Sequence, residues 1–324
     1  MVRVLLGLVP GMIAWVYFFG TGLIVHLALA LTTAYLAELA LLAIRRKAIG
    51  LFLSDGSAAV TACLLVLALP PMAPWWISVT GTLFAIVVAK QLYGGLGFNP
   101  FNPAMAGYAM LLVSFPREMT IWTAPLSLAP QTLSFVDTVK AIFVQTLPDN
   151  ITVDAVTMAT PLDILKTELA LEKTVAAITQ TSPLFGSMSG IGWEWINGAF
   201  LLGGLWLIYK RVVSWHVPGS MLVSLGLISL IAHLIAPEQY VSPLFHLLSG
   251  ATMLGAFFIA TDPVTAPTTP RGRIVFGASI GALVFVIRSY GGYPDAVAFA
   301  VLLMNMVTPT LDYYTQPRVY GHKR

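Results

Sequence analysis

The 324-residue sequence contains little charge and almost no cysteine. Charged residues make up 10% of the chain, hydrophobic residues make up 57%, and the mean hydropathy is +0.84. A soluble protein of this length needs far more polar surface, so the composition predicts an integral membrane protein. Cys63 is the single cysteine, which excludes an internal disulfide and an iron–sulfur cluster held by this chain's thiolates alone. Any electron carrier that the chain holds should therefore be organic.

The sequence also lacks the patterns typical of nucleic-acid binding, of metal binding and of a cleaved signal peptide. The net charge is +3, but the basic residues are scattered singly at the ends of apolar runs, so no nucleic-acid partner is predicted. The five histidines show no paired spacing on one helical face, so no metal site is predicted. The N-terminus has no small-residue cleavage site before its apolar segment, and we expect the first helix to insert uncleaved.

Apolar runs separated by polar or Pro/Gly breaks predict about ten transmembrane helices. The runs lie at about 3–20, 21–44, 57–71, 75–93, 101–115, 192–209, 217–236, 243–261, 273–288 and 295–312. The predicted fold class is therefore an all-α integral membrane protein.

Basic residues indicate the orientation of these helices. If ten spans cross the membrane alternately, one set of basic residues lies on the same side: Arg3, Arg45, Arg46, Lys47, Lys90, Lys210, Arg211, Arg271, Arg273, Arg318, Lys323 and Arg324. The positive-inside rule makes that side cytoplasmic, with both termini, in a bacterial inner membrane. The segment 116–191, where acidic residues outnumber basic ones, is then one long periplasmic loop between two transmembrane parts, 1–115 and 192–324.

The two transmembrane parts echo each other. Tyr93-Gly-Gly followed by 104–112 (AMAGYAMLL) resembles Tyr290-Gly-Gly followed by 296–303 (AVAFAVLL). Five spans separate the copies, so they have opposite orientation, which predicts an inverted 5+5 repeat. Interrupted backbone near 99–103 and 291–295 would then mark a central site. The alternatives are recurrence by composition alone and ordinary proline helix starts.

The predicted periplasmic loop contains an attachment motif. Asp154, Thr157, Ala159 and Thr160 read D-x-x-T-x-A-T, which resembles the acceptor on which a periplasmic flavin transferase esterifies FMN to the last threonine. Pro161 favours extended backbone at Thr160, which a transferase can bind. Asp154 either orients the segment or meets a metal of the transferase. The alternative is that these are ordinary loop residues.

A second threonine competes with Thr160. The segment 249–252 (SGAT) looks like an acceptor, but His246 stands where the motif has Asp, and the segment continues into a predicted spanning helix. Its small residues favour close helix packing instead of attachment at Thr252.

Four carboxylates are candidates for an ion pathway. Glu38 lies within a predicted span, where a carboxylate is costly and therefore suggests a functional role. Asp55, Asp262 and Asp295 lie at helix ends. The alternative interpretation is a snorkelling Glu38 and helix-capping aspartates.

Several stretches together identify a family resemblance: 98–108 (FNPFNPAMAGY), 247–258 (LLSGATMLGAFF), 261–264 (TDPV), 288–295 (RSYGGYPD) and 318–324 (RVYGHKR). Over essentially its whole length the chain resembles the RnfD family, the D subunits of the Rnf ion-translocating oxidoreductase complexes, which are called Rsx in enteric bacteria. Family members usually carry a short N-terminal extension before the first helix, so a partner contact or a helix there is expected to be missing or truncated.

The resemblance implies a function. A member of the RnfD family would carry covalent FMN, here on Thr160, as an electron relay, and the complex would couple electron flow from ferredoxin or NADH to Na⁺ or H⁺ movement. The implied partners are the A, B, C, E and G subunits of the Rnf complex and a flavin transferase. A second, noncovalent flavin such as riboflavin is also implied. The chain alone would not be catalytic.

Two other functions stay open. The B subunit of the sodium-pumping NADH:quinone oxidoreductase shares the architecture, although its usual long N-terminal extension is absent here. A channel or secondary transporter for a small solute would suit an inverted repeat with few membrane charges and would need no flavin.

Overall fold

Helices are the dominant regular structure of the chain. The computed structural model describes residues 1–148 and 151–317, so the basic residues Arg318, Lys323 and Arg324 and the rest of the 318–324 stretch, including His322, lie outside the described residues. Within the described ranges the only β-pairing consists of two isolated bridges, Thr123 with Thr157 and Phe185 with Gly190. The predicted all-α class is confirmed.

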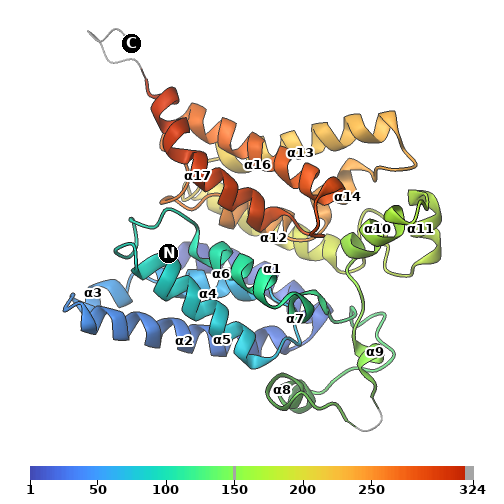
Figure 1. Ribbon diagram of the computed structural model, residues 1–324, viewed down its shortest axis with the longest axis horizontal. Coiled ribbons are helices and arrows are strands. Elements are labelled where there is room, and N and C mark those ends of the chain that lie inside the picture. Colours follow the sequence, from blue (N-terminus) through green and yellow to red (C-terminus); the bar gives the residue numbers. More distant parts are fainter. Residues whose placement is uncertain (149–150, 318–324) are drawn as a thin grey trace.

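The first part of the chain supplies the helices drawn in blue and teal in Figure 1. In chain order they are α1 (Val2–Phe19), α2 (Gly22–Ile44), α3 (Ile49–Leu53), α4 (Ser57–Val66), α5 (Trp75–Leu83), the π-helix η1 (Phe84–Gln91) and α6 (Pro103–Ser114). Each of the five apolar runs predicted between 3 and 115 contains at least one of these helices, and the run 75–93 contains both α5 and η1. The run 57–71 ends early because Pro70 and Pro71 cannot continue a helix.

The segment 116–191 forms short helices outside the long helices of the bundle, with α10 and α11 on the right of Figure 1 and α8 at its lower edge. They are α7 (Pro116–Thr120), α8 (Phe135–Val144), α9 (Val153–Val156), α10 (Pro161–Ala170) and α11 (Val175–Thr181). A small apolar cluster joins Leu162, Leu165 and Ile178 of this segment to Val241 and Phe245. The segment is therefore packed against the bundle, as its apolar spacing predicts.

The remaining helices form the second part of the bundle. They are α12 (Trp193–Tyr209), α13 (His216–Ile235), α14 (Pro243–Leu248), α15 (Thr252–Leu254), the π-helix η2 (Gly255–Ile259), α16 (Pro270–Tyr290) and α17 (Val297–Thr315). The run 243–261, predicted as one helix, is interrupted at Ser249–Ala251 because Gly250 has φ +56°, a left-handed conformation. Thr252 therefore begins a short helix after this break.

Six helical segments within the described residues are long and apolar enough to cross a membrane. They are Val2–Phe19, Gly22–Ile44, Ile49–Val66, His216–Ile235, Pro270–Tyr290 and Val297–Thr315. Interrupted helices such as α5 with η1, and α14 with α15 and η2, fall outside that length criterion. The chain is a multi-pass membrane protein, and the number of ten spans stays a prediction.

The two parts of the bundle meet through helices of both. Helix α1 packs on α12 and α6 packs on α17, while α13 packs on α16 within the second part. Small residues permit the first contact: a Cβ built on Gly203 would lie 2.0 Å from the Gly7 carbonyl oxygen. The first predicted span thus packs on the sixth, and the fifth packs on the tenth. The inverted repeat stays a prediction.

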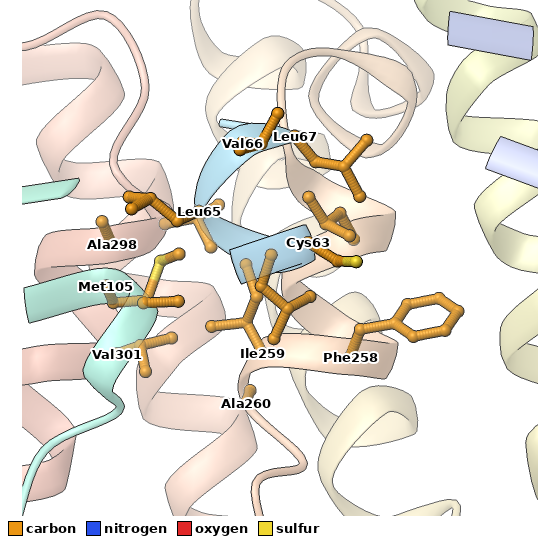
Figure 2. Packing of buried hydrophobic residues seen from close by; sticks show 14 of the residues in the cluster. Cys63, Leu65, Val66, Leu67, Met105, Phe258, Ile259, Ala260, Ala298 and Val301 are labelled. Atoms are coloured by element: carbon orange, nitrogen blue, oxygen red, sulfur yellow. The ribbon is translucent and has the colours of Figure 1, made fainter. Parts of the chain in front are cut away.

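One hydrophobic core runs through both parts. Cys63, Leu65 and Val66 of α4 lie between α6, η2 and α17, where they contact residues such as Met105 and Ile259 (Figure 2). Every one of these side chains is buried. The two parts are thus one packed unit.

Candidate functional site

Thr160 caps the helix α10. Its backbone is extended, with φ −72° and ψ 156°, as Pro161 predicts. Its Oγ1 accepts a hydrogen bond of 3.2 Å from the Asp163 amide N–H, which is the usual contact of a threonine N-cap. The hydroxyl therefore stands at the positive end of a ten-residue helix.

Thr160 also lines a cavity between the two parts of the bundle. The cavity walls combine Trp15 from α1, Tyr108 from α6, Trp122 from the 116–191 segment and Trp193 from α12. The Trp122 and Trp193 rings lie 5.4 Å apart, centroid to centroid. Asp295 lines the same cavity. A half-buried hydroxyl thus faces a space with mainly aromatic and apolar walls.

The other motif residues lie beside this cavity and are not part of its lining. Asp154 is exposed on α9. Thr157 pairs with Thr123 in the isolated bridge, and its Oγ1 donates to the Val153 carbonyl. Ala159 is half-buried. The motif therefore begins on the short helix α9 and continues in extended conformation from Thr157 to Thr160, where the Met158 amide donates to the Trp122 carbonyl.

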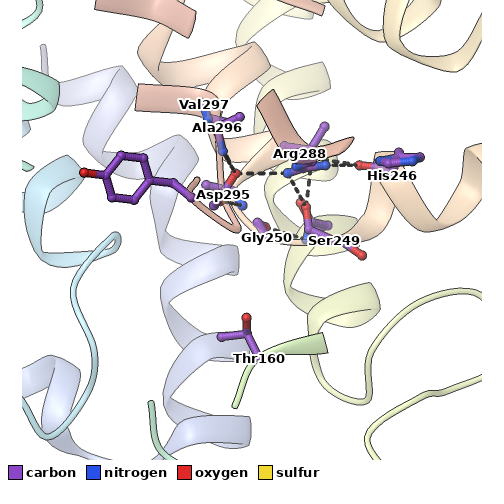
Figure 3. Close-up of polar contacts among 12 residues, drawn as sticks. Thr160, His246, Ser249, Gly250, Arg288, Asp295, Ala296 and Val297 are labelled. Atoms are coloured by element: carbon purple, nitrogen blue, oxygen red, sulfur yellow. Dashed lines mark hydrogen bonds and ion pairs between the residues drawn. The ribbon is translucent and has the colours of Figure 1, made fainter. Parts of the chain in front are cut away.

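Above Thr160, a buried network surrounds the helix break at 249–251, and the Thr160 hydroxyl is directed toward it (Figure 3). The Arg288 guanidinium donates to the carbonyls of His246 (2.8 Å) and Ser249 (3.2 Å), to Thr252 Oγ1 (2.9 Å) and to Asp295 (3.1 Å). Asp295 also accepts from the amides of Ala251 and Ala296, both at 2.8 Å. Arg288 therefore holds the broken helix and the start of α17 together.

The Arg288 network also contains Thr252, the second candidate acceptor for the flavin. Thr252 is fully buried, and its hydroxyl donates to the His246 and Ser249 carbonyls while accepting from Arg288. A hydroxyl with three partners and no exposure is a poor acceptor for a bulky group. Thr252 is thus enclosed, whereas Thr160 is half-buried and lines a cavity.

A second buried ion pair lies near the opposite end of the bundle. Lys90 donates to Glu38 Oε1 at 2.6 Å and to Ser57 Oγ at 2.6 Å, and Gln91 donates to the same Glu38 oxygen at 2.8 Å. Glu38 does not snorkel, because only 1% of it is exposed. Lys90 bound to Ser57 at the start of α4 resembles Arg288 bound to Thr252 at the start of α15.

Lys90 lines a second cavity, whose mainly apolar walls contain several polar side chains. Ser57, Asn99, Asn102 and Asp262 also line it. Within the described part of the chain, Asn99 Oδ1 and Glu38 Oε2 are buried without a hydrogen-bond partner. Asp55 lies at the edge of this region, where its Oδ1 accepts from the Ser57 amide at 2.6 Å. Three of the four predicted ion-path carboxylates thus gather near this end of the bundle.

The first two turns of α10 contain two titratable groups with shifted pKa values. Burial raises the pKa of Asp163, and the Lys166 charge partly offsets this rise. Burial also lowers the pKa of Lys166, an effect that Asp163 partly offsets. Burial on α10 therefore disfavours the charged forms of both side chains, and the two groups partly compensate each other.

Nearly the whole chain matches one protein family. Residues 1–321 match the family described as NQR2, RnfD, RnfE. The chain belongs to this family. Three relatives, each named as the D subunit of an ion-translocating oxidoreductase complex, come from Pectobacterium atrosepticum (54% identical), Yersinia pestis (53%) and Escherichia coli strain SMS-3-5 / SECEC (50%). Each alignment covers 100% of this chain and 94% of the relative.

Within this NQR2, RnfD, RnfE family member, sequence reasoning identified some cavity residues and missed others. Thr160 and Asp295 were predicted as separate candidates, and the structure places them on one cavity. The sequence reasoning did not predict roles for Arg288, for Lys90 or for the aromatic walls. Lys90 and Arg288 each lie in an apolar stretch shortly before a Gly-Gly pair, and this shared position could have indicated the two networks. Among the described residues no cluster of His, Cys, Asp or Glu could hold a metal ion.

Proposed function

We propose that this chain is the membrane subunit of an ion-translocating electron-transport complex and carries FMN, bound covalently through a phosphoester to Thr160. The relatives' shared name supports the complex. The observation that carries the FMN assignment is the position of Thr160: it ends the attachment motif, caps α10 and faces an aromatic cavity.

The residues around Thr160 fit FMN. A phosphate at the start of α10 would meet the amide N–H groups of Leu162 and Asp163 and the positive end of the helix. The rings of Trp122 and Trp193 offer flat apolar surfaces for an isoalloxazine and exclude water from it. When bound, FMN supplies reversible electron transfer. The chain's own residues orient and enclose it.

The proposal includes a membrane arrangement and partners. We place both termini in the cytoplasm and segment 116–191 in the periplasm of the bacterial inner membrane, so that a periplasmic flavin transferase reaches Thr160. The partners are the A, B, C, E and G subunits of the complex. The coupled ion is Na⁺ or H⁺.

The second cavity suits a noncovalent flavin such as riboflavin. Asn99, whose buried Oδ1 has no hydrogen-bond partner, offers a polar group to the edge of an isoalloxazine, and Phe257 and Phe258 line the apolar side. Glu38, Asp55 and Asp262 lie around this cavity, while Asp295 lies at the first one. These four carboxylates remain the candidates for an ion path between the two ends of the bundle.

Substitution of Thr160 in the assembled complex tests the function. Thr160→Asn keeps a capping side chain and removes the hydroxyl, so α10 should stay folded while electron transfer and ion uptake in vesicles are lost. Thr174→Ala removes a comparable cap from α11 and should leave both activities in place. Ion uptake that survives in Thr160→Asn would reject FMN as a relay here. A transporter without flavin would behave in that way.

A further inference from the structure

One side chain connects the helix that begins at Thr160 to the loop that lines the opposite wall of its cavity. Lys166 lies six residues after Thr160 on α10, and its Nζ donates to the Gly291 and Tyr293 carbonyls, the latter at 3.1 Å. Both carbonyls belong to the connection between α16 and α17. The contact joins residues more than a hundred positions apart in the sequence.

This loop is itself part of the cavity. Pro294 and Asp295, which directly follow Tyr293, line the same space as Thr160. Asp295 in turn binds Arg288 and the amide of Ala251 at the helix break. A continuous series of contacts therefore leads from α10 through the loop to the buried network.

The face of α10 explains why Lys166 controls its position. Leu162 and Leu165 pack on Val241 and Phe245, and Lys166 lies one turn beyond Leu162 on the same side of the helix. Apolar burial of this kind holds a helix against a surface but has no directional preference of its own. The hydrogen bonds from the Lys166 ammonium to two carbonyls are directional, because their strength depends on distance and angle. Lys166 therefore fixes how α10 lies on the second part of the bundle.

We propose that Lys166 is the positioning residue of the flavin site: it fastens α10 to the α16–α17 loop and so determines where a group attached to Thr160 lies in the aromatic cavity. This inference rests on the proposed attachment of FMN to Thr160. Lys166 does not touch the flavin and acts through the helix and the loop.

The test uses the full-length chain, matured with the flavin transferase and reconstituted in nanodiscs. Lys166→Met removes both hydrogen bonds, and Lys166→Arg keeps a cation of similar reach. The matched control is Lys173→Met, because Lys173 lies just after α10 and pairs with Glu168 of that helix, largely exposed to solvent. Three properties are compared: covalent flavin content, hydrogen exchange of the α10 amides, and quenching of flavin fluorescence by iodide.

We expect all variants to carry covalent flavin. In Lys166→Met, loss of the charge-assisted bonds should lower the protection of α10 amides by roughly ten- to a hundredfold and should increase iodide quenching. Lys166→Arg should restore both properties in large part, and Lys173→Met should match the wild type.

The outcomes separate the two proposals. Unchanged exchange and unchanged quenching in Lys166→Met would overturn the role of Lys166. Faster exchange with unchanged quenching would show that Lys166 only supports the fold, which also overturns it. A wild-type chain without covalent flavin would reject the attachment, whereas the exchange comparison would still report on the Lys166 contact.

Discussion

The buried ion pair between Lys90 and Glu38 offers the sharpest prediction about stability. The side chains are each only 2% exposed, and Lys90 Nζ lies 2.6 Å from Glu38 Oε1. In Lys90→Met the Glu38 carboxylate keeps the Gln91 hydrogen bond and loses its counter-charge. Removing one partner of a buried pair costs about 3–5 kcal/mol, because an uncompensated charge stays in a medium of low dielectric constant.

An exposed pair in the same chain provides the comparison. Lys173 pairs with Glu168, and these side chains are 54% and 32% exposed. Such pairs contribute about 0–1 kcal/mol, so Lys173→Met should change the free energy of unfolding by no more than that. The ratio of folded to unfolded protein should therefore fall roughly a hundredfold or more in Lys90→Met and less than about tenfold in Lys173→Met.

The assay is reversible unfolding in mixed detergent micelles, followed by tryptophan fluorescence. The double variant Lys90→Met with Glu38→Leu should recover much of the loss, because two apolar side chains replace the pair without leaving a charge. A Lys90→Met variant as stable as Lys173→Met, or a double variant less stable than Lys90→Met, would refute this reasoning.

Three further predictions concern the network, the interface between the two parts and pH. Arg288→Met should destabilise the chain by about 3–5 kcal/mol, because Asp295 and the carbonyls at the helix break 249–251 lose their hydrogen-bond donor. Arg288→Lys should recover little of this stability, because an ammonium cannot reproduce the guanidinium geometry. Unfolding in micelles measures the stability of both variants. Gly203→Val should separate α1 from α12 and lower the melting temperature, since even a Cβ would lie 2.0 Å from the Gly7 carbonyl oxygen. Gly198→Val is the control, because a Cβ there meets open space. Equal melting temperatures of the two variants would contradict this prediction. For Asp163 the folded-state pKa is raised above the unfolded value, so its contribution to stability is present below the unfolded pKa and is lost as pH rises through the folded pKa. Asp163→Asn should remove this loss from a melting-temperature series across the acidic range, and an identical series in both proteins would contradict the assignment.

Much of the helical architecture follows from the sequence because lipid requires long apolar segments with paired backbone. Runs such as 3–20 and 21–44 correspond closely to α1 and α2. Pro161 predicts the extended Thr160, and Pro103 forms an ordinary helix start capped by Asn102. These features depend on local sterics, which one sequence is enough to reveal.

The tertiary contacts of the site could not be predicted in this way. Lys166 binds carbonyls of a loop far along the chain, and only the folded arrangement of α10 and α16 brings them together. The break at Gly250 depends on Arg288 and Asn197, which donate hydrogen bonds to carbonyls around the break. Hydropathy alone describes 243–261 as one apolar run, because it does not count these hydrogen bonds.

The central claim is that the Thr160 hydroxyl carries FMN, and intact-mass analysis of the purified chain tests it most directly. The chain is produced with the flavin transferase as wild type, Thr160→Asn and Thr252→Ala, and each sample is also denatured and viewed in the gel under ultraviolet light. The account predicts one added flavin phosphate and flavin fluorescence in the wild type and in Thr252→Ala, and neither in Thr160→Asn. A fluorescent, mass-shifted Thr160→Asn, or a dark wild type, would contradict it.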